Sequence, residues 1–214
     1  MTLPFSLKDI SVKQYQEIYP HLQLALHSEI EIIRLDEWVK IISILSGKTV
    51  DEIEDIEFKQ LKEYKKQLSF LTEPYPQLIK KYIWVKGSLY KGTNNAEDLN
   101  TSQIVAIKTF LSSGETIEQL HNVAPCCYKK LTWKGWKFNG NNHKELSEAF
   151  SNKSTADILP LVFFCSKVLL SLIQDSEHYS NSLKVIQSRM EEVNQAILDG
   201  SFLNTGDGTP QLMK

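Results

Sequence analysis

The side chains that most often carry out catalysis or bind metals are few and scattered in this sequence. The five histidines are His21, His27, His121, His143 and His178. No two of them have the H-E-x-x-H spacing that places two metal ligands on one helical face, so we expect surface or loop residues. The adjacent thiols of Cys126 and Cys127 cannot converge on one ion as those of C-x-x-C do, and Cys165 lies far along the chain. We therefore expect core or interface thiols and no metal site.

The sequence also lacks the motifs of nucleophilic catalysis. Cys126 with His121 comes nearest to a nucleophile and its base, but the sequence indicates no third group to orient the histidine. It contains no G-x-S-x-G turn and no glycine-rich phosphate loop. We therefore expect a protein that is not an enzyme and needs no cofactor.

Aromatic side chains and lysines are interleaved in two short segments, which could bind a partner. The aromatic residues are Trp84, Tyr90, Trp133, Trp136 and Phe138, and the lysines are Lys81, Lys86, Lys91, Lys134 and Lys137. Rings among lysines can hold single-stranded nucleic acid by stacking and charge. The pattern is also typical of half-buried hairpins whose lysines face water and protect the sheet edges, the interpretation that we favour. A third interpretation is a protein interface anchored by exposed tryptophans.

We predict that both segments are β-hairpins. Tyr82–Val85 is rich in aromatic and β-branched residues, Lys86-Gly87 is a turn, and Ser88–Tyr90 returns. The second hairpin covers Leu131–Phe138, with its two tryptophans around Lys134-Gly135.

The residues before the hairpins have the periodicity of amphipathic helices. Ser11 opens a capping box with Gln14, which predicts the start of a helix. Pro20 predicts a break or kink near Tyr19, after which residues 24–33 continue as helix.

The clearest structural signal lies in residues 30–71. The apolar face of a first helix is formed by Leu35, Trp38, Ile41, Ile42 and Leu45. Asp36 and Glu37 would lie in its first turn, where carboxylates favour the positive end of the helix dipole. Gly47 would end the helix in the left-handed conformation.

A short helix and a longer one come after this turn. Thr49 and Glu52 form a second capping box, which opens the short helix. The longer helix starts at Phe58 and is stopped by Pro74 and Pro76.

Two parts of the sequence resemble each other. Residues 98–104 repeat the order of acidic, aliphatic, capping residue and later glutamine found in residues 9–15. Residues 118–127 can be laid on residues 36–45 without gaps. An ancient duplication would explain both similarities, and so would two unrelated amphipathic helices with ordinary caps.

The C-terminal part predicts two helices of different character. Residues 158–173 are apolar on most sides, which indicates a buried central helix, yet they are too short and too polar to cross a bilayer. The last helix, about residues 180–198, carries an a/d seam that needs a partner helix. The candidate interface residues of this seam are Leu183, Ile186, Met190, Val193 and Ile197. Trp84, Trp133 and Trp136 are candidate interface residues in the hairpins.

The predicted fold is mainly α, with amphipathic helix pairs, two small β-hairpins and a C-terminal coiled-coil-like helix. The predicted parts are an N-terminal helical half (1–76), a second half with the hairpins (77–156), C-terminal helices (157–200) and a flexible tail (201–214). The net charge of −2 gives no global basic field that would hold nucleic acid. We expect neither nucleic acid nor a membrane as a partner.

Several segments together resemble a known family. They are ISVKQYQEI, the stretch EWVKIISILSGKTVDEIEDIEFKQLKEYKKQLSFL, KGSLYKG, LNTSQIVAIKTFL and LPLVFF. This combination, over roughly residues 5–170, resembles small morphogenesis proteins of the tail and structural modules of tailed bacteriophages, particularly those of Bacteroidetes hosts. The C-terminal seam is not part of the resemblance, and the resemblance carries no catalytic residues.

The resemblance implies a non-enzymatic tail or neck component, or an assembly chaperone. Its partners would be further copies of itself, or tail tube, neck or portal proteins. It would act in the host cytoplasm during assembly, and the resemblance leaves open whether it stays in the virion. The alternative from a different class is an accessory protein that binds single-stranded nucleic acid through the aromatic–lysine hairpins.

Overall fold

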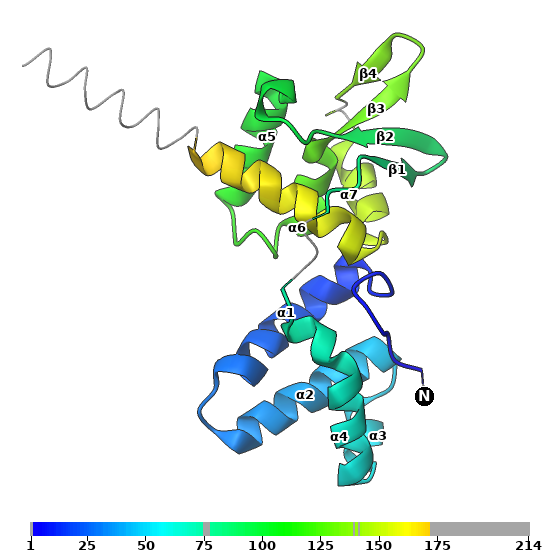
Figure 1. Ribbon diagram of the computed structural model, residues 1–214, viewed down its shortest axis with the longest axis vertical. Coiled ribbons are helices and arrows are strands. Elements are labelled where there is room, and N and C mark those ends of the chain that lie inside the picture. Colours follow the sequence, from blue (N-terminus) through cyan, green and yellow to red (C-terminus); the bar gives the residue numbers. More distant parts are fainter. Residues whose placement is uncertain (1, 75–77, 139, 141, 172–214) are drawn as a thin grey trace, which may run out of the picture. The chain divides into compact units, whose positions relative to one another are not determined.

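The computed structural model describes residues 2–74, 78–138, 140 and 142–171 of the 214-residue chain (Figure 1). In this part the fold is mainly α-helical with one small antiparallel sheet, which confirms the predicted fold class. The described residues up to Leu169 form one compact unit. The helices are α1 (Val12–His27), α2 (Glu31–Ser46), α3 (Val50–Glu54), α4 (Phe58–Gln67), α5 (Thr101–Leu111), α6 (Leu120–Val123), α7 (His143–Ser151) and one over residues 155–171.

Helix α1 begins at the predicted capping box and runs through its proline. The backbone N–H of Gln14 donates to Ser11 Oγ at 3.2 Å, and the Gln14 side chain accepts from the Ser11 backbone. Of the predicted break or kink near Tyr19, the break is wrong, because α1 is continuous across Pro20. A proline inside a helix costs about 3 kcal/mol or more, and burial of Ile18, Leu22 and other residues of this face offsets that cost.

Helix α1 includes residues 24–27 as predicted but does not continue to residue 33. It ends at His27, where Ser28 takes an extended conformation and its side chain accepts from the N–H of Ile30 at 3.2 Å. Serine competes for backbone groups in this way and favours turns over helix interiors.

Helix α2 starts earlier than the sequence indicated. It begins at Glu31, so Asp36 and Glu37 lie beyond its first turn, and that prediction is wrong. Of the predicted apolar face, Leu35 is 41% exposed and therefore does not belong to it. The other four, Trp38, Ile41, Ile42 and Leu45, are buried as expected.

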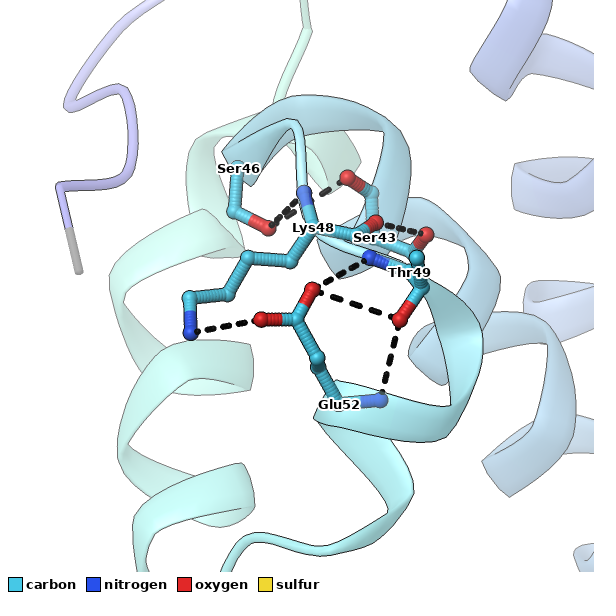
Figure 2. A network of polar contacts seen from close by, with 5 residues as sticks. All are labelled: Ser43, Ser46, Lys48, Thr49 and Glu52. Atoms are coloured by element: carbon cyan, nitrogen blue, oxygen red, sulfur yellow. Dashed lines mark hydrogen bonds and ion pairs between the residues drawn. The ribbon is translucent and has the colours of Figure 1, made fainter.

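The turn from α2 to α3 is a connected set of polar contacts (Figure 2). Gly47 has a φ of +69° and ends α2, as predicted. The backbone N–H of Glu52 donates to Thr49 Oγ1 at 3.3 Å, and Glu52 Oε2 accepts from the Thr49 N–H at 2.9 Å. The predicted capping box is therefore confirmed. Ser43 Oγ adds a bond of 2.6 Å to the carbonyl of Lys48, which ties the end of α2 to the turn.

The two predicted hairpins are present and form a single sheet. The strands are β1 (Tyr82–Val85), β2 (Ser88–Gly92), β3 (Tyr128–Thr132) and β4 (Gly135–Lys137), in the order β1-β2-β3-β4. The first hairpin turns at Lys86 and Gly87, as predicted. The second starts at Tyr128, earlier than predicted, and turns at Trp133 and Lys134, with Gly135 already in β4. The φ of +96° at Gly135 meets the need of a tight hairpin for a left-handed residue beside its turn.

One face of the sheet packs against two helices. The ring of Phe150 on α7 lies 5.3 Å from that of Tyr128 and 5.9 Å from that of Tyr90, measured between centroids. A Cβ atom placed on Gly92 would lie 2.7 Å from Leu161 Cδ2, so the glycine permits close contact with the 155–171 helix. That helix buries Ile158, as predicted for a central helix, and its other buried apolar residues are Leu159, Leu161, Val162, Cys165 and Leu169.

Backbone and side-chain bonds connect α1 to the later elements. The N–H of Val12 donates to the carbonyl of Lys153 at 2.8 Å, and the N–H of Thr155 donates to that of Ile10 at 2.8 Å. The side chain of Gln16 donates to the carbonyl of Ile117 at 2.9 Å. The start of α1 is thus fixed by residues more than a hundred positions away.

Helix α5 begins at a capping box formed by Asn100 and Gln103, which matches the box of α1. The four apolar positions laid on α2, which are Leu120, Val123, Ala124 and Cys127, are all buried. They occupy α6 and a short 3₁₀ helix, where their counterparts occupy one long helix. Duplication therefore stays a hypothesis.

Candidate functional site

The candidate functional site is the outer face of the sheet, opposite α7. Tyr82 and Trp84 point to this side of β1, since side chains alternate along a strand and Ile83 and Val85 are buried on the other side. Tyr82 is paired with Lys91 of β2, and Lys91 with Lys129 of β3. Residues in direct register share a face, so this set of side chains extends across the sheet.

The same register places Trp136 on this face. Leu131 lies two positions after Lys129 on β3 and is paired with Trp136 of β4. We call this set the aromatic face, and it comprises Tyr82, Trp84, Leu89, Lys91, Lys129, Leu131 and Trp136.

The aromatic face is open to solvent within the described part of the chain. The exposed fraction is 64% for Trp84 and 45% for Tyr82, while Val85 of the same strand is fully buried. Leu131 is 46% exposed. Large apolar side chains that are grouped and exposed mark binding surfaces more often than single exposed residues do.

A ring contact on this face joins the two edge strands of the sheet. The centroids of Tyr82 on β1 and Trp136 on β4 are 5.8 Å apart, with the planes inclined by 35°. These strands are the two edges of the sheet. Four flat strands spaced about 4.8 Å apart would separate their edges by about 14 Å, so the contact requires the two side chains to lean toward each other across a twisted sheet.

Lysines surround the rings. The ammonium group of Lys81 lies 5.6 Å from the ring centroid of Tyr82, and that of Lys134 lies 4.5 Å from the ring centroid of Trp133. The segments 78–92 and 128–138 contain eight lysines and no aspartate or glutamate, although the whole chain has a net charge of −2. The lysines are Lys80, Lys81, Lys86, Lys91, Lys129, Lys130, Lys134 and Lys137. The charge of the protein is therefore unevenly distributed, and the sheet is a basic region of the described chain.

A hollow of about 240 Å³ adjoins the free edge of β1. Tyr82 and Trp84 line it together with Lys80 and Lys153. Asp157 also lines it and forms a 2.6 Å ion pair with Lys80. The hollow thus combines aromatic walls with cations at the border of the aromatic face.

The structure brings together only some of the residues that the sequence singled out. Trp84 and Trp136 share the aromatic face, whereas Trp133, 90% exposed, lies at the turn between β3 and β4. The interpretation as half-buried hairpins is correct for one side of β1, where Ile83 and Val85 are buried. The seam residues Leu183, Ile186, Met190, Val193 and Ile197 lie outside the described residues.

Sequence reasoning missed a second exposed apolar surface, at the end of the α1–α2 helical hairpin. We call it the α1–α2 tip, and it comprises Leu24, Leu26, Ile30, Ile32, Ile33 and Leu35. Their exposed fractions range from 38% to 78%. The spacing of several of these residues fits a helical period, which by itself predicts buried helix faces. The dense aliphatic run around Ile32 and Ile33 was the available signal.

The thiols are buried and unreactive in character. Burial, with a smaller effect of Cys165, raises the pKa of Cys126 to about 12, and burial raises that of Cys127 well above its ordinary value. Both side chains are fully buried, which agrees with the expectation of core thiols. Such groups do not form the thiolate that nucleophilic chemistry requires.

Two histidines lie in helices and are partly buried, in contrast to the expectation of surface or loop residues. The Nδ1 atom of His121 lies 2.9 Å from the side-chain nitrogen of Gln16, and the ring of His143 stacks on Phe110 at 4.5 Å between centroids. Burial lowers the pKa of both imidazoles. No group of three or more His, Cys, Asp or Glu side chains within the described residues is arranged to hold a metal ion.

Comparison with known proteins gives no relative for this chain. No protein-family model, no curated protein and no solved structure matches it. Among the described residues, no helix is both long enough and apolar enough to span a bilayer.

Proposed function

We propose that this chain is a non-enzymatic protein that works through protein–protein contacts during the assembly of a larger particle. The resemblance of its sequence to phage morphogenesis proteins suggests the tail or neck of a bacteriophage as that particle. Its partners would be further copies of the chain, or tail tube, neck or portal proteins.

The observation that supports this proposal is the α1–α2 tip. Ile32 is 78% exposed and Ile30 is 57% exposed, on a helical hairpin in which Trp38 and Ile41 are buried. Leaving such side chains in water forgoes roughly 1.5–3 kcal/mol for each side chain that a partner could bury completely. Because Ile32 and Ile33 lie on a formed helix, their backbone loses little further freedom on binding.

Charged residues border the aliphatic ones. Glu29, Glu31 and Arg34 lie between the exposed residues of the tip and are themselves exposed. Binding surfaces of non-obligate complexes typically combine an apolar centre with a polar rim. The tip therefore has the composition of a surface that tolerates water in the free protein and becomes buried in a complex.

The test is the oligomeric state of the full chain at tens of micromolar, measured by light scattering after size exclusion. We expect a wild-type mass above that of the monomer, and a monomer for the double variant Ile30→Glu, Ile32→Glu. The matched control is Val105→Glu, Leu78→Glu, because Val105 is 57% exposed and Leu78 is 84% exposed, away from the tip. The control should retain the wild-type mass.

If the wild-type chain is a monomer, the same variants are compared in pairwise pull-downs with the structural proteins encoded beside it. The proposal then requires one partner that the tip variant loses and the control keeps. The proposal is contradicted if the wild-type chain is a monomer and no neighbouring protein binds it better than it binds the tip variant.

A further inference from the structure

We propose that the aromatic face binds single-stranded nucleic acid, a second activity that goes beyond protein assembly. The sequence by itself favours two separate, half-buried hairpins. The pairing of β2 with β3 favours nucleic-acid binding instead, since it places Trp84 and Trp136 on one surface. Lys91 and Lys129 lie between the edges of that surface.

The rings supply stacking surfaces for bases. Trp84 keeps 64% of its surface exposed and Tyr82 keeps 45%. Trp133 extends from the β3–β4 turn with 90% of its surface exposed. Every base has a flat aromatic face, so exposed rings on a rigid sheet bind unpaired bases with little dependence on sequence.

The lysines supply the contacts to phosphate. Of the sheet lysines, Lys80 and Lys86 are engaged in ion pairs with Asp157 and Glu145. The ammonium group of Lys129 donates to the backbone carbonyl of Asp98. Lys91 and Lys134 form no ion pair within the described part of the chain. Lys91 lies on the aromatic face and Lys134 lies at the turn beside Trp133, and the strands and turns of the sheet contain no carboxylate. This side of the sheet is therefore complementary to a polyanion.

Exposed rings together with lysines distinguish single strands from other polyanions. A duplex exposes its phosphates to the lysines but hides the faces of its bases inside the helix, so the rings would have nothing to stack on. The hollow beside β1, with Tyr82 and Trp84 in its walls, gives a base a concave place at the edge of the face. Lys153 also lines it, beside the ion pair of Lys80 with Asp157.

Binding is measured with the full chain and a fluorescent single-stranded oligonucleotide of about 15 mixed nucleotides, by anisotropy. If about three phosphates are contacted, raising the salt from about 50 to about 200 mM weakens binding by about 20-fold. Quenching of tryptophan fluorescence on binding is the second readout, because Trp38 is only 3% exposed and the other three tryptophans lie in the sheet region.

Two pairs of variants separate the contribution of base stacking from that of charge. Trp84→Ala should weaken binding by about 5- to 150-fold through lost stacking, and Phe58→Ala on α4 is the control with a comparable exposed fraction of 58%. Lys134→Gln should reduce the slope of log affinity against log salt by about 0.7. Lys59→Gln, exposed on α4, should leave the slope unchanged.

The substituted residues are exposed, so unaltered helical circular dichroism is expected and serves as the check on folding. Absence of binding at about 50 mM salt overturns the proposal. So does a duplex, or heparin, that competes as well as the unlabelled single strand, because it shows that charge alone is responsible. An affinity that Trp84→Ala and Phe58→Ala reduce equally overturns it as well.

Discussion

The Nδ1 atom of His21 on α1 lies 2.5 Å from Oε2 of Glu37 on α2, and Glu37 Oε1 accepts from Lys40 at 2.8 Å. Glu37 is only 5% exposed. Its burial acts to raise its pKa, but the hydrogen bonds with Lys40 and His21 outweigh this effect and hold the pKa below the ordinary value of 4.5. The contact between His21 and Glu37 thus connects the two long N-terminal helices through a buried, ionised carboxylate.

This arrangement predicts a loss of stability in acid. A lowered pKa in the folded state means that the ionised carboxylate stabilises the fold above about pH 4.5, and that this contribution is lost as the pH falls through the folded-state pKa. Urea unfolding at neutral pH should show Glu37→Gln to be less stable than the wild type by about 1–3 kcal/mol. The difference should shrink steadily towards about pH 3. Glu63→Gln, at an exposed site on α4, is the control, and a Glu37→Gln deficit that does not change with pH would refute the assignment.

Gly47 should tolerate asparagine better than valine. Its φ is +69°, and an added Cβ would meet no heavy atom within 4 Å, so the cost of substitution arises from the backbone and not from crowding. Left-handed conformation costs most residues about 1–2 kcal/mol, asparagine adopts it more readily, and a β-branched residue is the least suited. Thermal melts of Gly47→Asn and Gly47→Val measure the difference. Equal melting temperatures for the two variants would show that this conformation does not limit the choice of residue.

Removal of the Thr49 hydroxyl should cost about 1 kcal/mol, the typical value for a lost N-cap. The hydroxyl accepts from the N–H of Glu52, so Thr49→Ala leaves that donor without its partner. Thr49→Ser keeps the oxygen and should be nearly neutral in chemical denaturation. Equal losses for both variants would mean that the methyl group, and not the cap, is what matters at this position.

The cysteines should be protected in the folded protein. All three are buried, and burial raises the pKa of Cys126 to about 12, so the thiolate is scarce at neutral pH. A disulfide reagent such as dithiobisnitrobenzoate should react very slowly with the native chain and should titrate three thiols once the chain is unfolded. Fast reaction of the native protein would show that this core opens readily.

Local features of the fold could be predicted from the sequence because a few adjacent residues suffice to form them. The capping boxes at Ser11 and Thr49 depend on a glutamine or glutamate three positions later, and Gly47 meets a local need for positive φ. The turn at Lys86 and Gly87 is equally local. Each of these signals lies within one turn of the chain, so no distant contact decides the outcome.

The tertiary structure decided which segments lie side by side. Pairing of Lys91 with Lys129 joins strands that are nearly forty residues apart, and no local pattern specifies that contact. Helix α1 crosses Pro20 because packing against α2 outweighs a local preference, and Leu35 is exposed although its spacing fits the buried face. Side-chain periodicity reports which residues can share a face, whereas burial of that face requires another element to cover it, and only the folded chain supplies that element.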